Sequence, residues 1–161
     1  MKKYLTFLFC IVLINTSLFA GEIDSLLVQL ETIMKARGQY QIIKEIELNG
    51  LKKLLHEAKG KPDEMYYVTT QIIQEYIPFT FDSALHYINQ NLVLSRLANN
   101  ARMLNETRLL LSQILSSSGQ YKESLDVLAD VNRGALTREM LVDYYSSYWK
   151  VYSELAYYSV I

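Results

Sequence analysis

The side chains best suited to metal binding or catalysis are scattered along this chain of 161 residues. Two histidines occur, His56 and His86, and neither has a second histidine or a cysteine at the spacing of a metal site. His56 lies among leucines and charged residues, which favours a place on a helix surface or in packing. His86 follows Asp82 by one helical turn, which allows a local hydrogen bond and no more. We therefore expect no metal site and no cofactor.

The possible nucleophiles and paired carboxylates also lack the context that catalysis requires. Ser116, Ser117 and Ser118 lie where a helix is predicted to end, without the strand–turn–helix context of an activated serine. No glycine-rich phosphate loop is present. Carboxylates that lie close to each other in the sequence, such as Glu45 and Glu47, are predicted to face solvent, whereas a catalytic pair needs burial. The sequence predicts a protein that is not an enzyme.

Aromatic side chains near the end of the chain are the one unusual feature. Tyr144, Tyr148 and Tyr152 recur every four residues, so they should form a stripe along one helix face, and Tyr145 and Trp149 should form an adjacent row. These five residues are the candidate ligand or partner surface, because tyrosine and tryptophan stack on sugars and anchor peptides. The alternative interpretation is that the rings only pack against neighbouring helices.

The first twenty residues have the layout of a cleaved secretory signal peptide. Lys2 and Lys3 precede an apolar run over residues 5–14, and Ala20 supplies the small residue before the cut. The run is shorter than the roughly 20 residues of a membrane-spanning helix, so a retained anchor is the weaker alternative. Lipidation at Cys10 is weaker still, because Cys10 lies inside the run. We expect an exported protein, located in the periplasm.

Composition limits the partners of the remaining chain, residues 21–161. Removal of the signal leaves 14 basic and 17 acidic residues, a net charge of −3, so we expect no binding to nucleic acid. The only cysteine leaves with the signal. Only six glycines and two prolines occur in the whole chain, which favours long helices over a sheet with many turns.

Apolar residues recur at helical spacing along almost all of residues 21–161. Gly38 is predicted to separate the first two helices, Asp63 and Asp82 to cap the third and fourth, Gly119 to end the fifth, and Thr137 to cap the seventh. The expected helices cover residues 23–34, 40–59, 64–76, 82–97, 101–117, 121–131 and 137 to the end.

Two of these helices resemble each other in a way typical of tetratricopeptide repeats. Phe81–Ile88 aligns with Tyr121–Leu128 on aromatic, small, leucine and aliphatic positions, with Ala84 and Ser124 at the small position. A small residue is needed there because the two helices of a repeat approach closely. The repeats lie 40 residues apart, against about 34 in the standard repeat, so they are irregular. The predicted fold class is all-α, with antiparallel helix pairs stacked as a tetratricopeptide-like right-handed solenoid.

A family resemblance covers the whole of residues 21–161. The chain resembles the exported repeat domain of a family of membrane-tethered regulators from Bacteroidota. The matching positions are Asp24–Leu27, Ile33, Arg37, Tyr40, Lys44–Glu45, Leu51–Lys52, Phe81–Ala84, Leu115–Gly119 and Tyr144–Tyr145. Such regulators continue into one transmembrane helix, a coiled coil and a cytoplasmic helix-turn-helix domain.

The resemblance implies a periplasmic sensor module of a transcriptional regulator, with a glycan, a peptide or a partner protein as its ligand. The sequence stops at Ile161, within the predicted first helix of a repeat. An uncovered terminal repeat exposes apolar surface, so we expect residues 21–161 to be the truncated N-terminal part of such a regulator. The alternative is a stand-alone periplasmic scaffold for protein–protein interaction.

Overall fold

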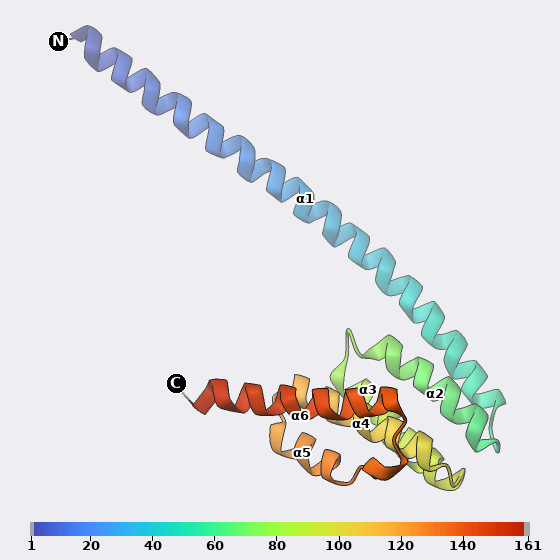
Figure 1. Ribbon diagram of the computed structural model, residues 1–161. Helices are drawn as coiled ribbons and strands as arrows, with labels where there is room; N and C mark the ends of the chain where they lie inside the picture. Colours follow the sequence, from blue (N-terminus) through green and yellow to red (C-terminus); the bar gives the residue numbers. More distant parts are fainter. Residues whose placement is uncertain (1, 160–161) are drawn as a thin grey trace. The chain divides into compact units, whose positions relative to one another are not determined.

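The computed structural model describes the backbone of residues 2–159 and the side chains of residues 23–158. Six α-helices and one short 3₁₀ helix account for nearly all of this part of the chain, and no strand occurs in it (Figure 1). The elements are α1 (Lys2–Glu57), α2 (Pro62–Tyr76), α3 (Phe81–Leu97), α4 (Ala101–Ser117), α5 (Tyr121–Ala129), η1 (Arg133–Ala135) and α6 (Arg138–Ser159).

Residues 23–57 form one uninterrupted part of α1, so the predicted break at Gly38 is wrong. Gly38 lies inside the helix, with no atom within 4 Å of the position that its Cβ would occupy. A single glycine in a helix interior costs only about 1 kcal/mol relative to alanine, and its neighbours Ala36, Arg37 and Gln39 tolerate the helix well. The backbone hydrogen bonds therefore continue across it.

Met1–Ile46 form one compact unit, and Glu47–Ile161 form a second. In the first unit the predicted apolar stripe is present, and its six members are each more than half exposed: Ile23, Leu26, Leu27, Leu30, Ile33 and Met34. The predicted signal peptide, residues 1–20, lies outside the residues whose side chains are described. Within the described part of the chain, no helix combines the length and the apolar character needed to cross a membrane.

The starts of α2 and α3 differ from the prediction by one or two residues. Lys61 is the N-cap of α2 and Thr80 is the N-cap of α3, so Asp63 and Asp82 do not cap these helices but lie in their first turns. Pro62 determines the start of α2, since its fixed φ suits the first helical position. Both carboxylates still lie close to the positive end of a helix dipole.

The predicted caps at the end of α4 and at the start of α6 are confirmed, and α4 has a further cap at its start. Gly119 adopts φ +80°, and the Gln120 amide donates to the Leu115 carbonyl (2.9 Å), which is the Schellman ending that glycine permits. At the other end of α4, the Asn100 side chain accepts from the amides of Arg102 and Met103. The Thr137 hydroxyl accepts from the Met140 amide at 3.3 Å, which confirms Thr137 as the cap of α6.

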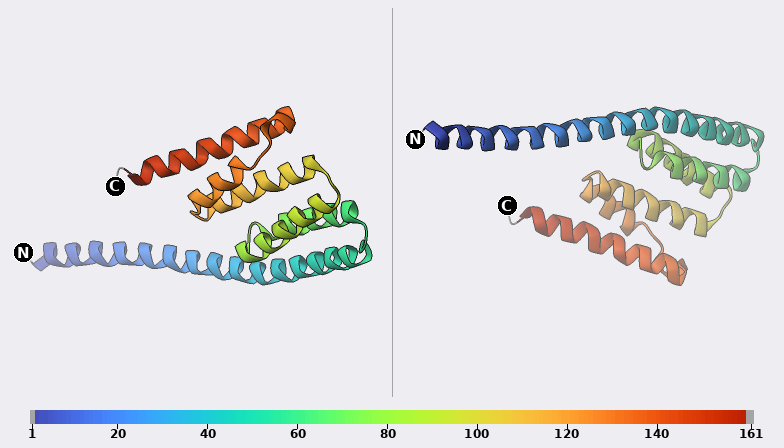
Figure 2. Two further views of the ribbon diagram at one scale, coloured as in Figure 1. Left: turned by 90° about the horizontal axis from the view of Figure 1, so that it is seen from below. Right: turned by 90° about the horizontal axis from the view of Figure 1, so that it is seen from above.

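Helices α2 to α6 pack in succession within the second unit. The most extensive contacts join α2 with α3, α3 with α4, α4 with α5, and α6 with both α4 and α5 (Figure 2). Ala84 and Ser124 are fully buried, as the small position of the repeat requires. The Ser124 hydroxyl lies 2.9 Å from both the hydroxyl and the carbonyl oxygen of Ser112, so α4 and α5 approach closely there.

Three apolar clusters form the core of this unit, and the third of them consists of Tyr66, Leu94 and Met103. Ile73, Ile88 and Ile114 belong to the first cluster, which joins α2, α3 and α4. The second joins α4, α5 and α6 around Leu109, Leu128, Val131 and Met140. α5 ends at Ala129, two residues earlier than predicted, yet Val131 remains buried in the second cluster. The architecture is the predicted all-α stack of helix pairs.

Candidate functional site

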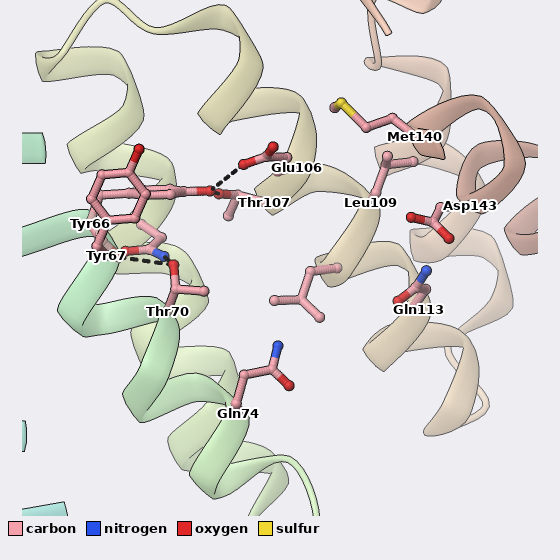
Figure 3. Close-up of a pocket in the computed structure, with 12 residues that line it drawn as sticks. Tyr66, Tyr67, Thr70, Gln74, Glu106, Thr107, Leu109, Gln113, Met140 and Asp143 are labelled. Carbon is pink, nitrogen blue, oxygen red and sulfur yellow. Dashed lines mark hydrogen bonds between the residues drawn. The ribbon is translucent and has the colours of Figure 1, made fainter. Parts of the chain in front are cut away.

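A pocket of about 300 Å³ lies between α2, α4 and α6 (Figure 3). We call it the acidic pocket, because Glu106 and Asp143 line it and no basic side chain does. Gln74 projects into it from α2, and Gln113 and Asp143 line the opposite side from α4 and α6. The complete lining is Tyr66, Tyr67, Thr70, Gln74, Asn91, Glu106, Thr107, Leu109, Leu110, Gln113, Met140 and Asp143.

Hydrogen bonds hold the α2 side of this pocket in place. The buried Tyr66 hydroxyl donates to the Met103 carbonyl at 3.1 Å, which ties α2 to α4. Burial raises the pKa of Tyr66 above its usual value, so the phenol keeps its proton, and with it this bond, to a more alkaline pH than an exposed tyrosine would. Thr70 and Thr107 each donate to the backbone carbonyl four residues earlier, which fixes their side chains on the pocket wall.

Asn91 reaches this pocket from α3 and is only 2% exposed. Its amide nitrogen donates to the Thr70 hydroxyl at 2.8 Å, while its side-chain oxygen has no hydrogen-bond partner. A buried acceptor without a partner costs about 1–3 kcal/mol. A ligand that supplies an N–H or O–H group would remove this cost. The acidic pocket is thus suited to hydrogen-bond donors and unsuited to phosphates.

A second pocket, of about 360 Å³, lies beside the first along α4 and α6. We call it the serine–lysine pocket. It shares Leu110 and Gln113 with the acidic pocket, so the two pockets adjoin, and we call them together the groove. Its other lining residues are Ile77, Ile114, Ser116, Ser117, Ser146, Ser147 and Lys150. No carboxylate lines it, and the Lys150 ammonium donates to the Ser117 hydroxyl at 2.8 Å.

Residues 34–161 match the family described as the SusR N-terminal TPR domain. The chain belongs to this family. The match confirms the resemblance inferred from the sequence and, with the helical pairs, the tetratricopeptide fold. No curated protein and no solved structure matches the chain.

Two of the five predicted surface residues are partly buried. Tyr144 and Tyr148 pack against the second core cluster, with ring centroids 5.0 Å apart. The predicted stripe continues from Tyr148 to Tyr152, whose rings stack at 6.1 Å. For Tyr144 and Tyr148 a packing role within the domain is therefore established, and a binding role for the stripe stays a prediction.

The other three aromatic residues are exposed. Tyr145 is 54% exposed, Trp149 74% and Tyr152 57%. None of the five predicted residues lines either pocket, because α6 presents Met140, Asp143, Ser147 and Lys150 to the groove instead. The structure thus separates two surfaces on α6, one polar and facing the groove, the other aromatic and facing solvent.

The groove residues of α6 were missed by reasoning from the sequence. Met140, Asp143, Ser147 and Lys150 are spaced by three, four and three residues, which is the spacing of one helix face. This spacing is visible in the sequence, but the aromatic rings that dominate the segment favour the neighbouring face as the candidate surface. His56 and His86 are both exposed, and among the described residues no cluster of histidine, aspartate or glutamate could hold a metal ion.

Replacing Trp149 with alanine is expected to change the free energy of unfolding of the domain by no more than about 0.5 kcal/mol, because the ring is mostly exposed. A core tryptophan would cost about 3–5 kcal/mol. Urea unfolding followed by circular dichroism measures the difference. Tyr148→Ala, one residue earlier and half-buried, is the matched control and should be clearly more destabilising. A large loss for Trp149→Ala would contradict the exposed position.

Alkaline pH is expected to weaken the domain through Tyr148. Burial, together with the hydrogen bond and charge of Tyr144, raises the pKa of Tyr148 to about 12. In the unfolded chain the same phenol ionises near pH 10, so the unfolded state loses its proton first and stability falls between pH 10 and 12. Urea unfolding at pH 9 and pH 11 should show this fall, and Tyr148→Phe should reduce it. An unchanged pH dependence in Tyr148→Phe would contradict the assignment.

Proposed function

We propose that this chain is the exported, ligand-sensing part of a membrane-bound transcriptional regulator, and that it has no enzymatic activity. The observation that carries the proposal is the pair of adjoining pockets along α2, α4 and α6, whose wall holds a buried acceptor without a partner. A leader at residues 1–20 would export the domain. The family match supports a helical-repeat binding module, and the sensor role goes beyond it.

The arrangement of the groove explains how binding would be transmitted. Its walls come chiefly from three helices: α6 packs on α4, while α2 packs on α3 and is tied to α4 by the hydrogen bond of Tyr66. A ligand that contacts all three helices favours the packing in which its contacts are best satisfied, and so shifts the equilibrium between stacked arrangements. α6 would carry that change toward the following part of the regulator.

A stand-alone scaffold for envelope proteins is the second candidate function. Its support is the solvent-facing row of Tyr145, Trp149 and Tyr152, since exposed tyrosine and tryptophan are the commonest anchors of protein interfaces. In that case the occupied surface would be the aromatic face of α6 and not the groove.

Substitution of Gln113 by arginine distinguishes the two functions, because Gln113 lines both pockets and a longer side chain there obstructs the whole groove. In a strain that carries Gln113→Arg, the sensor function predicts altered transcription of a defined set of genes, measured by RNA sequencing. Lys122→Met, on the exposed face of α5, is the control. Unchanged transcripts in Gln113→Arg would contradict the sensor function. Sequencing the gene beyond codon 161 adds a second test, since a regulator must continue into a membrane helix and a DNA-binding domain.

A further inference from the structure

The serine–lysine pocket carries information about the ligand itself. We propose that this pocket binds the C-terminal carboxylate of a short peptide whose last residue is aliphatic. The inference rests on the proposed function of the groove as a ligand site, and it adds the chemical class of the ligand.

Ser116 is the first observation. Its side chain is 3% exposed, lines the pocket, and its hydroxyl has no hydrogen-bond partner. Helical serines usually donate to the carbonyl four residues earlier, as Ser117 and Ser147 do here. For Ser116 that carbonyl belongs to Ser112, which accepts instead from Ser124. A hydroxyl proton without an acceptor therefore remains buried in the pocket wall.

Lys150 is the second observation. Its ammonium lies at the pocket wall and donates to the Ser117 hydroxyl, which uses its own proton on the Gln113 carbonyl. An ammonium has three donors, so two remain for a ligand. No described carboxylate forms an ion pair with Lys150, and none lines the pocket. A single cation with neighbouring hydroxyl groups matches a carboxylate of one negative charge.

The apolar walls identify what carries the carboxylate. Ile77, Leu110 and Ile114 line the same pocket, and they offer an aliphatic side chain a place next to the bound carboxylate. Beyond Leu110 and Gln113 the groove becomes the acidic pocket, where Glu106, Asp143 and the Asn91 oxygen accept hydrogen bonds. A peptide that runs from one pocket to the other would place its N–H groups against these acceptors. The cation of the serine–lysine pocket would therefore face the carboxylate at the end of the peptide, and the acceptors of the acidic pocket would face the N–H groups that precede it.

Calorimetric titration of the purified chain with N-acetyl-Ala-Ala-Leu and with the amide of the same peptide tests the inference. The acid should bind at least about tenfold more tightly than the amide, since only the acid makes the charge-assisted bonds. Lys150→Met should weaken binding of the acid by about tenfold or more and leave binding of the amide unchanged. Ser116→Ala should weaken binding of the peptide acid without lowering the melting temperature of the protein. Lys122→Met removes the same charge on an exposed surface outside the groove and should change neither affinity.

Several outcomes would overturn the inference. Equal affinity for the acid and the amide would contradict it. So would a Lys150→Met variant that binds the acid as tightly as the unchanged protein does. Binding of glucuronate in place of the peptide, sensitive to Lys150→Met, would show that the carboxylate belongs to a sugar acid and reject the peptide. If no acid binds while Gln113→Arg still alters transcription, the sensor function stands and this site falls. If the acid binds as expected while Gln113→Arg alters no transcript, the site stands and the sensor function falls.

Discussion

Replacing Ile88 with alanine is expected to lower the free energy of unfolding by about 2–5 kcal/mol. Ile88 is fully buried on α3, in the cluster that also contains Ile73 from α2 and Ile114 from α4. Alanine removes apolar contacts to two neighbouring helices and leaves a cavity that the surrounding helices can fill only in part. Urea unfolding followed by circular dichroism measures the loss.

Val93 provides the matched control for this substitution. It lies on the same helix but is 52% exposed, so Val93→Ala should change stability by no more than about 0.5 kcal/mol. Similar losses for Ile88→Ala and Val93→Ala would mean that α3 is not packed between α2 and α4 as described.

Replacing Ser124 with leucine is expected to cost about 2–4 kcal/mol, through overpacking and through the loss of its hydrogen bonds. Ser124 is fully buried, and its hydroxyl lies 2.9 Å from the Ser112 hydroxyl on the facing helix. A leucine can be accommodated only if α5 moves away from α4. The shift would also loosen the second core cluster, which includes Leu128 of α5.

Two further variants separate volume from hydrogen bonding at this position. Ser124→Ala removes the hydroxyl but fits the space, so it should cost about 1 kcal/mol. Glu123→Leu introduces the same leucine at the exposed neighbouring position of α5 and should be nearly neutral. A well-tolerated Ser124→Leu would show that the close approach of the two helices does not limit the size of this residue.

The repeat pattern was predictable because it follows from close packing. Ala84 and Ser124 had to be small if the helices of each pair touch, and the structure buries both. α4 begins and ends where the sequence indicates, because Gly119 permits a left-handed turn that other residues resist. Thr137 caps α6 for a similarly local reason.

Features that depend on competition between neighbouring signals were predicted less well. Gly38 was expected to break a helix, but the helical preference of the surrounding residues outweighs one glycine. Asp63 and Asp82 are good caps by type, yet Pro62 and the turn at Thr80 place the helix starts earlier. Such outcomes depend on small differences in free energy that a residue's type does not reveal.

The groove was the least predictable part. Asn91 and Ser116 are common residues whose importance comes from burial without a partner, and burial depends on the packing of three helices. Asp143 and Lys150 lie on the same face of α6, but nothing in the sequence shows that this face, and not the aromatic one, borders a pocket.

The succession of contacts from α2 to α6 has a consequence for how this part of the chain folds. Each contacting pair of helices is adjacent in the sequence or separated by one helix, so few contacts require long loops to close. Proteins with such low contact order fold in microseconds to milliseconds, because little chain entropy is lost before the contacts form. We expect the α2–α3 and α4–α5 hairpins each to act as a nucleus from which folding spreads to its neighbours.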